Sequence, residues 1–292
     1  MNKVIGYIRL MRVANVVTSV ADVLAGIAIS GYFLTHGDYL PIILLCISTI
    51  GLYSGGIIFN DVFDASLDKI ERPERPIPSG LISIKEAAVF GSGCFAIGII
   101  AAGLYQSASL IIAILIVIAC ITYNKWLKHH KLLGPLNMGI CRGLNLLLGI
   151  SILMPVMYDW WFLSLIPIIY IYSITMISRG EVHGGNKNTL LIATLLYLVV
   201  ISSILFVSYN KQHILQTLIF ILPFTWMIYS PLLRAIQQPV GPNIGKAVKA
   251  GVIALILLNA AWASAFGTWQ LALIIVILLP LSLWLSKTFA VT

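Results

Sequence analysis

The chain has 292 residues, of which 60% are hydrophobic and only 10% are charged, and its mean hydropathy is +1.00. So few charged side chains cannot cover the surface of a soluble domain of this length, which excludes a water-soluble protein and predicts a multi-pass membrane protein. The formal charge of +8 is explained by basic loops on one side of a membrane, so we expect no nucleic-acid partner.

Ten apolar segments are long enough to cross a bilayer, which requires roughly 17 to 25 residues per helix. They are 12–34, 39–59, 82–104, 107–124, 135–156, 160–177, 188–208, 213–235, 246–266 and 268–286. The last two are joined only around Gly267, so nine spans and a re-entrant piece are the alternative. We therefore predict an all-α polytopic membrane protein with nine to ten transmembrane helices.

The distribution of basic residues predicts the orientation. If the N-terminus is cytoplasmic, 17 of the 18 Lys and Arg residues lie on or near the cytoplasmic side, and only Lys211 lies outside. We expect a bacterial inner (cytoplasmic) membrane as the location. A single domain, 1–292, is predicted, with halves of about 1–134 and 135–292. A weak internal repeat is consistent with this division.

The most polar stretch of the chain, 60–80, follows the second apolar segment. On a helix, Asn60, Asp61, Asp64 and Asp68 share one face, and like charges this close repel each other. Carboxylate and amide oxygens are suitable ligands for Mg²⁺, which shares its coordination shell with water and substrate phosphates. The stretch therefore predicts a magnesium site, and a solvated charged loop between two helices is the alternative.

Two arginines, Arg72 and Arg75, follow the acidic residues within a turn or two. Guanidinium groups bind phosphate oxygens through paired hydrogen bonds, so both arginines are predicted to bind a phosphate group. Three prolines in the same stretch end the helix and stiffen the chain after it.

Polar residues also lie inside the apolar segments. Asn15, Ser19 and Asp22 form a stripe on the first helix, where they either join helices by hydrogen bonds or line a substrate cavity. Arg142 and Asn145 lie about two turns into the fifth segment. An arginine at that depth indicates a functional site, although a simple pair with Asp22 is the alternative.

Two further polar loops are predicted on the same side of the membrane as 60–80. The first contains Tyr123 and Lys128, which either clamp a diphosphate or anchor the loop at the lipid headgroups. The second, 178–187, contains Arg179, Glu181 and Lys187 among several glycines. Its glycines suit close approach of the backbone to a phosphate, and Glu181 or His183 could meet a metal or act as a base, whereas an ordinary turn is the alternative.

The spacing Asn60-Asp61-x-x-Asp64-x-x-x-Asp68 resembles the first aspartate-rich motif of the UbiA superfamily of intramembrane prenyltransferases. The similarity continues to Gly80, to the Tyr/Lys loop and to the arginine of the fifth helix. It implies helices around a central cavity that is capped on the cytoplasmic side and open laterally to the lipid tail. It also implies Mg²⁺ ions that bind a polyprenyl diphosphate, and a small acceptor, commonly an aromatic compound or a quinone precursor.

The chain departs from the family pattern at two places. Lys128 lies one residue further from Tyr123 than in the family's Tyr-x-x-x-Lys. The second aspartate motif is replaced by Arg179-Gly180-Glu181-Val182-His183, which has one carboxylate and resembles the EboC-type branch. Arg179 is therefore predicted to replace some of the positive charge of a second metal ion.

The leading hypothesis is a Mg²⁺-dependent prenyltransferase with Asp64, Asp68 and Arg142 as catalytic residues. The alternatives are a protein of the same fold that binds or transports an isoprenoid without breaking a bond, and an unrelated secondary transporter whose Asp22 and Arg142 carry coupling charge. The predicted substrate-binding residues are Asn15, Arg72, Arg75, Tyr123, Lys128, Asn145, Arg179 and Lys187, and the predicted metal ligands are Asn60, Asp61, Asp64, Asp68 and Glu181.

Overall fold

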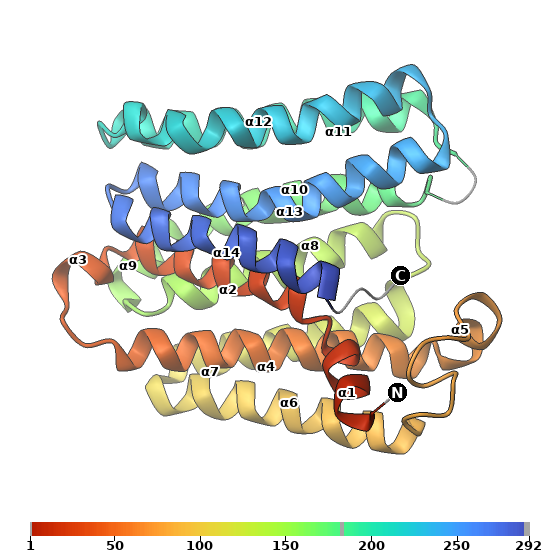
Figure 1. The fold of residues 1–292 in the computed structure, drawn as a ribbon. Helices are drawn as coiled ribbons and strands as arrows, with labels where there is room; N and C mark the ends of the chain where they lie inside the picture. Colours follow the sequence, from red (N-terminus) through yellow and green to blue (C-terminus); the bar gives the residue numbers. More distant parts are fainter. Residues whose placement is uncertain (1, 182–183, 289–292) are drawn as a thin grey trace.

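The computed structural model describes residues 2–181 and 184–288, and this part of the chain is helical without a strand (Figure 1). The helices of the first half are α1 (Lys3–Met11), α2 (Val13–Ser30), α3 (Tyr32–Thr35), α4 (Leu40–Phe63), α5 (Ala65–Glu71), α6 (Ile84–Tyr105), α7 (Ser107–Thr122) and the π-helix η1 (Tyr123–Leu127). Those of the second half are α8 (Leu133–Ile150), α9 (Met154–Trp160), the 3₁₀ helix η2 (Trp161–Ser164), α10 (Leu165–Ser178), α11 (Lys187–Asn210), α12 (Ile214–Gln237), α13 (Gly241–Ala265) and α14 (Trp269–Thr288).

Nine helical segments within these residues are long and apolar enough to cross a membrane. The expected span 135–156 is carried by α8, which falls outside this set but packs against α2, α7 and α10 inside the bundle. The prediction of nine to ten transmembrane helices is therefore confirmed. The last two expected spans are separate helices, α13 and α14, because Gly267 takes a φ of 79° and lets the chain reverse.

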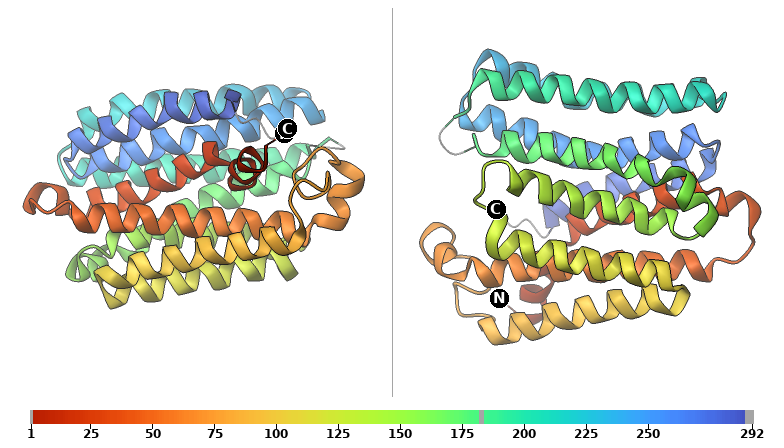
Figure 2. Two further views of the ribbon diagram at one scale, coloured as in Figure 1. Left: turned by 60° about the horizontal axis from the view of Figure 1, so that its bottom comes forward. Right: turned by 180° about the vertical axis from the view of Figure 1, so that it is seen from behind.

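Helices α2, α8 and α13 lie in the interior of the bundle, and two outer pairs flank them (Figures 1 and 2). The pair α11 and α12 forms one edge, whereas α6 and α7 form the opposite edge. Large apolar side chains on these edges are exposed, including Trp226 and Val89, each at 74%. Exposed apolar surface on this scale is expected where lipid, not water, surrounds the protein.

Two glycines explain how closely α2 and α8 cross. A Cβ added to Gly26 would lie 2.3 Å from the carbonyl oxygen of Leu146, and one added to Gly149 would lie 2.2 Å from that of Val23. Only glycine leaves room for backbones at this separation, as in other closely packed membrane helices. The crossing brings the polar residues of both helices together inside the bundle.

A small apolar core holds the charged segment after α4 in place. Helix α1 lies across the end of α4, and Leu10 and Ile58 pack there with Ile77 and Ile82 of the segment that follows α5. All four side chains are less than 10% exposed. At the end of this segment, Ser83 and Glu86 form a capping box that starts α6. The charged segment is therefore an ordered part of the fold.

Candidate active site

One cavity of about 420 Å³ lies among α2, α4, α7, α8, α10 and α13. Its apolar wall includes Leu52, Ile57, Ile116, Met138, Ile171, Ile174, Val252 and Leu255. Its polar lining has two parts. The loop end consists of Arg12, Asn60, Arg72, Tyr123, Asn124 and Lys128, and the deep end consists of Asn15, Tyr53, Arg142 and Asn145. Asn60 lies seven positions after Tyr53, which places the two ends about 10 Å apart along α4.

Two of the three aspartates in the 60–80 stretch meet around one arginine. Arg75 Nη1 lies 2.8 Å from Asp68 Oδ2 and 3.3 Å from Asp61 Oδ1. Arg12 Nη2 approaches the same Asp61 oxygen at 2.6 Å. These two carboxylates lie close together, and arginines offset their repulsion. The four polar residues do not share one helix face as expected, because Asp61 is on α4 and Asp68 is on α5. Arg75, which we expected at a phosphate, is buried with its charge between the two aspartates and does not line the cavity.

The third aspartate points another way because the helix changes direction there. Helix α4 ends at Phe63, and Asp64 links it to α5. The Asp64 carboxylate forms an ion pair with Lys128, which lines the cavity. This contact joins the end of α4 to the segment after α7. The aspartate stretch and the Tyr/Lys loop therefore meet at one end of the cavity.

A π-helical turn accounts for the unusual Tyr/Lys spacing. In η1 the amide of Lys128 donates to the carbonyl oxygen of Tyr123 at 2.9 Å, which is the i to i+5 hydrogen bond of a π-helix. The wider turn absorbs the extra residue, so Tyr123 and Lys128 both line the cavity. The turn is held by Asn124, whose Nδ2 donates to the carbonyl oxygen of Gly56 at 2.9 Å and whose Oδ1 accepts from Asn60 at 3.0 Å.

The 178–187 loop lies beside this end of the cavity. Arg179 Nη2 donates to the carbonyl oxygen of His130 at 2.6 Å, and the charge of Arg72 acts on Glu181. Burial of part of the Glu181 side chain raises its pKa, and Arg72 opposes this shift. Neither Arg179 nor Glu181 lines the cavity, and Lys187 is exposed at the start of α11. His183 lies outside the described residues.

The loop glycines have a structural explanation. The amide of Gly185 donates to the carbonyl oxygen of Pro239 at 3.0 Å, and a Cβ at Gly185 would meet Ile244 at 2.7 Å. These glycines let the loop pack against the start of α13. The structure thus supports the turn interpretation for Gly185 and gives its amide a protein partner.

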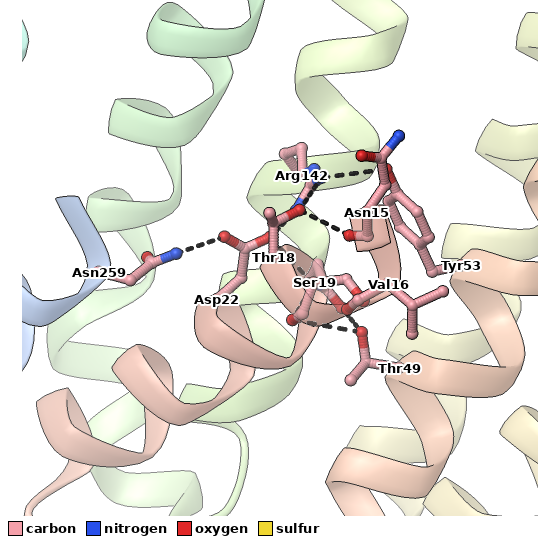
Figure 3. Close-up of polar contacts among 10 residues, drawn as sticks. Asn15, Val16, Thr18, Ser19, Asp22, Thr49, Tyr53, Arg142 and Asn259 are labelled. Carbon is pink, nitrogen blue, oxygen red and sulfur yellow. Dashed lines mark hydrogen bonds and ion pairs between the residues drawn. The ribbon is translucent and has the colours of Figure 1, made fainter. Parts of the chain in front are cut away.

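At the deep end a buried ion pair joins α2 to α8 (Figure 3). Arg142 Nη1 lies 2.6 Å from Asp22 Oδ2, and both side chains are less than 10% exposed. Arg142 Nη2 also donates to Thr18 Oγ1 at 2.8 Å and to the Tyr53 hydroxyl at 3.2 Å. Its guanidinium lies 4.9 Å from the centre of the Tyr53 ring. The expected pair of Asp22 with Arg142 is present, and Arg142 lines the cavity as well.

Asparagines complete this polar cluster. Asn145 Nδ2 donates to Asp22 Oδ2 at 3.1 Å and to the carbonyl oxygen of Ser19 at 2.9 Å. Asn145 Oδ1 accepts from Thr49 at 2.7 Å. On the other side, Asn259 of α13 donates to Asp22 Oδ1 at 2.7 Å (Figure 3). Of the polar stripe on the first helix, Asp22 and the carbonyl oxygen of Ser19 join helices through hydrogen bonds, and Asn15 lines the cavity.

Comparison with known proteins decides the family. Residues 23–244 match the UbiA prenyltransferase family. The chain belongs to this family. A digeranylgeranylglyceryl phosphate synthase of Saccharolobus solfataricus is 30% identical over 244 residues, which cover 75% of this chain and 84% of the relative. A second such synthase, from Sulfurisphaera tokodaii, is 34% identical over 178 residues, covering 61% of this chain and 62% of the relative.

Solved structures show the same fold. A structure of a digeranylgeranylglyceryl phosphate synthase has a TM-score of 0.68 and 24% identity, covering 91% of this chain and all of that one. A UbiA homolog from Archaeoglobus fulgidus, bound to GPP and Mg²⁺, has a TM-score of 0.62 and 15% identity, covering 86% of this chain and 99% of that one. The expected UbiA-like fold and enzyme class, a prenyltransferase that is an integral multi-pass membrane protein, are confirmed. The hypothesis of an unrelated transporter is therefore wrong.

Several site residues of this UbiA-family protein were missed by sequence reasoning. Arg12 comes between α1 and α2 with a φ of 47° and reaches Asp61 from there. Such backbone geometry is uncommon outside glycine and is often found at functional sites. Asn259 is the one side-chain amide in the apolar second half of α13, and its isolation was a signal in the sequence, whereas Tyr53 lies next to Ser54 in α4 and gave no such signal.

The expected metal ligands do not form one compact group. Within the described residues, no cluster of three or more His, Cys, Asp or Glu side chains has the arrangement of a metal site. Asp61 and Asp68 face Arg75, Asp64 faces Lys128, and Glu181 lies on a different loop. A metal ion held here would therefore take few ligands from the protein.

Proposed function

We propose that this chain transfers a prenyl group from a polyprenyl diphosphate to a small acceptor, aromatic or other, inside the membrane. The observation that carries the proposal is the order of groups in one cavity: three cationic residues at the loop end, an apolar wall, and an uncharged polar lining around Arg142. A prenyl diphosphate has a charged head and an apolar tail, so it matches the first two. The deep end is left for the acceptor.

The loop end is suited to a diphosphate. Arg12, Arg72 and Lys128 all line the cavity there, and guanidinium and ammonium groups bind phosphate oxygens well. Negative charge grows on the leaving diphosphate as the allylic C–O bond breaks. Fixed cations stabilise that charge, and removal of one such donor commonly costs roughly 10²- to 10³-fold in rate.

The residues present also fit Mg²⁺. This ion usually binds one or two carboxylates and takes its other ligands from water and substrate phosphates. Asp64 offers a carboxylate, and Asn60 keeps Oδ1 as an acceptor because its Nδ2 is the atom that donates to Asn124. When bound, Mg²⁺ supplies positive charge to the leaving diphosphate. Asp61 and Asp68 are paired with arginines, away from Asp64, so they would act on the ion through their charge and not as direct ligands.

The apolar wall protects the reactive carbon. Leu52, Ile116 and Ile174 line the cavity together with other aliphatic side chains. An allylic cation reacts readily with water, and a mostly aliphatic wall keeps water away from it until the acceptor attacks. Arg142 and Asn145 orient the acceptor from the deep end.

We place the site on the cytoplasmic side of the membrane. The concentration of Lys and Arg in the loops at this end supports the assignment, since cytoplasmic loops carry an excess of these residues. In a variant without native cysteines, single cysteines in 60–80, 125–134 and 178–187 should resist an impermeant external thiol reagent. A cysteine in place of Lys211 should react. Reaction of any of the first three from outside would contradict the shared cytoplasmic site.

The decisive experiment measures turnover in purified protein. Labelled geranylgeranyl diphosphate is incubated with a panel of acceptors, with Mg²⁺ and with EDTA. Mg²⁺-dependent formation of a prenylated product and inorganic diphosphate supports the proposal. Diphosphate binding without product for any acceptor favours the alternative, a binding or transport protein. Ligand flux in proteoliposomes then distinguishes transport from simple binding.

A further inference from the structure

The charges at the deep end cancel each other. Arg142 is paired with Asp22 at 2.6 Å, and both groups are buried among helices α2, α4, α8 and α13. At the loop end three cationic residues line the cavity, and two of them, Arg12 and Lys128, are also paired with carboxylates, those of Asp61 and Asp64. Within the described residues Arg72 has no ion-pair partner, so the excess positive charge belongs to the loop end.

Hydrogen bonds fix the side chain of Asp22 beside Arg142. Its two oxygens accept hydrogen bonds from Arg142, Asn145 and Asn259, which come from α8 and α13. The close crossing of α2 and α8 at Gly26 and Gly149 fixes the helices that carry the pair. Any anion that approached Arg142 would therefore meet the negative charge of Asp22 in a region of low dielectric constant, where repulsion between like charges is strong.

The deep end offers neutral hydrogen-bonding groups instead. The Tyr53 hydroxyl oxygen accepts from Arg142, so its own hydrogen is available to another partner. In the part of the chain that the structure describes, the side-chain amide of Asn15 makes no hydrogen bond, and it lies beside Tyr53 and Arg142 in the cavity (Figure 3). Both groups can bind a hydroxyl or carbonyl group without any change of charge.

We propose that the acceptor presents an uncharged hydroxyl or carbonyl group to the deep end, and that Asp22 determines this specificity by cancelling the charge of Arg142. The inference rests on the proposed function only in identifying the deep-end ligand as the acceptor. The name of the relatives describes a product that carries a phosphate group. The inference therefore predicts a different class of acceptor for this chain. A phosphorylated acceptor could not place its phosphate beside Arg142.

The test compares pairs of probes in which an anionic group replaces a neutral hydroxyl group on the same framework. One pair is 4-hydroxybenzyl alcohol and 4-hydroxybenzoate, and the other is a 1-O-alkylglycerol and its 3-phosphate. Their binding to the purified full-length chain is measured by calorimetry, with Mg²⁺ and inorganic pyrophosphate present to occupy the loop end. In the wild type, the neutral member of at least one pair should bind at least tenfold more tightly than its anionic partner.

The variant Asp22→Asn keeps the size of the side chain and removes its charge. It should shift the preference toward the anionic probe by at least tenfold, because Arg142 then has an uncompensated charge. The matched control is Asp38→Asn, the same change in the loop before α4, which should leave the preference unchanged. Size-exclusion chromatography and thermal unfolding establish that each variant is folded. The wild-type comparison tests the inference even if Asp22→Asn fails to fold.

Three results would overturn the inference: tighter binding of the anionic probes by the wild type, an unchanged preference in folded Asp22→Asn, or no binding of any probe. The proposed function is tested separately in the same samples. If pyrophosphate with Mg²⁺ fails to bind while the neutral probe binds, the diphosphate site is wrong and the deep-end specificity stands. If pyrophosphate binds and probe selectivity is absent, the deep-end inference is wrong and the diphosphate site stands.

Discussion

The two ends of the cavity contain similar chemistry in different surroundings. Both pair carboxylates with arginine or lysine. At the loop end the cations Arg12 and Lys128 are 25% and 24% exposed, while their partners Asp61 and Asp64 are 5% and 13% exposed. At the deep end both partners are buried, with Arg142 8% and Asp22 2% exposed. A partly exposed pair can exchange its partners for a ligand at low cost, but a buried pair that loses one partner leaves a charge in the interior.

This difference assigns different tasks to the two ends. The loop end is built from helix termini and loops, and in the proposed mechanism its cations move toward a diphosphate while the carboxylates receive a metal ion. The deep end is built from residues inside the helices and is held by hydrogen bonds between them. We propose that it acts as a rigid wall that orients a ligand. The predictions below test this contrast.

The largest effect, on the free energy of unfolding, is expected from a substitution at the deep end. Arg142→Met should lower the free energy of unfolding by about 3–5 kcal/mol, because Asp22 is then buried without a cation. The double variant Asp22→Asn/Arg142→Met should recover most of that loss. Chemical unfolding in detergent measures both. If the single variant is as stable as the wild type, the deep end is not a rigid ion-paired wall.

At the loop end, Asp64→Asn should reduce kcat by about 100-fold while the protein stays folded. Asp64 is our principal carboxylate for Mg²⁺, and the change also removes the ion pair with Lys128. Binding of Mg²⁺ with pyrophosphate should weaken in parallel. Asp38→Asn is the control because Asp38 lies in the exposed segment before α4. Similar losses in both variants would mean that the acidic stretch is only a solvated loop.

Changes in the length of the π-helical turn should have an intermediate effect on diphosphate affinity. Insertion of one alanine after Trp126 rotates Lys128 by about 100° relative to Tyr123 and should reduce diphosphate affinity about tenfold. Deletion of Trp126 restores a Tyr-x-x-x-Lys spacing, which an ordinary α-helix presents on one face, and should retain affinity close to the wild type. Isothermal titration with pyrophosphate measures both. Equal losses in the two variants would show that the spacing does not position Lys128.

The smallest effect is expected on the 178–187 loop. Arg179→Ala should weaken diphosphate binding about fivefold or less, since its guanidinium is exposed and donates to a backbone carbonyl outside the cavity. The apparent number of Mg²⁺ ions should not change.

Glu181→Gln tests the second metal ion. It should lower the apparent Mg²⁺ order by one only if Glu181 holds such an ion. Because the pKa of Glu181 is raised, its carboxylate becomes protonated at a higher pH than an ordinary glutamate. Any metal binding by Glu181 should therefore be lost at a higher pH than binding by an ordinary glutamate as the pH falls. Titration of diphosphate binding against Mg²⁺ at two pH values decides whether Glu181 takes part.

Local sequence patterns were sufficient for the fold class and for locating the aspartate stretch. Hydropathy predicts the spans because each helix must satisfy its own backbone hydrogen bonds in lipid. The aspartate stretch was recognisable because its residues lie within a few positions of each other along the chain. The UbiA resemblance rested on the same local spacing, and the family match confirmed it.

The partners of the charged side chains were decided only by the tertiary structure. Asp22 and Arg142 are 120 positions apart, and Arg12 and Asp61 are 49 apart. Arg75 faces two aspartates instead of the cavity because the segment after α5 folds back under α1. The π-helix that aligns Tyr123 with Lys128 is held by Asn124 through contacts with α4. Spacing along the chain predicts which residues share a helix face, but helix crossings determine which faces meet, and those depend on packing between distant segments.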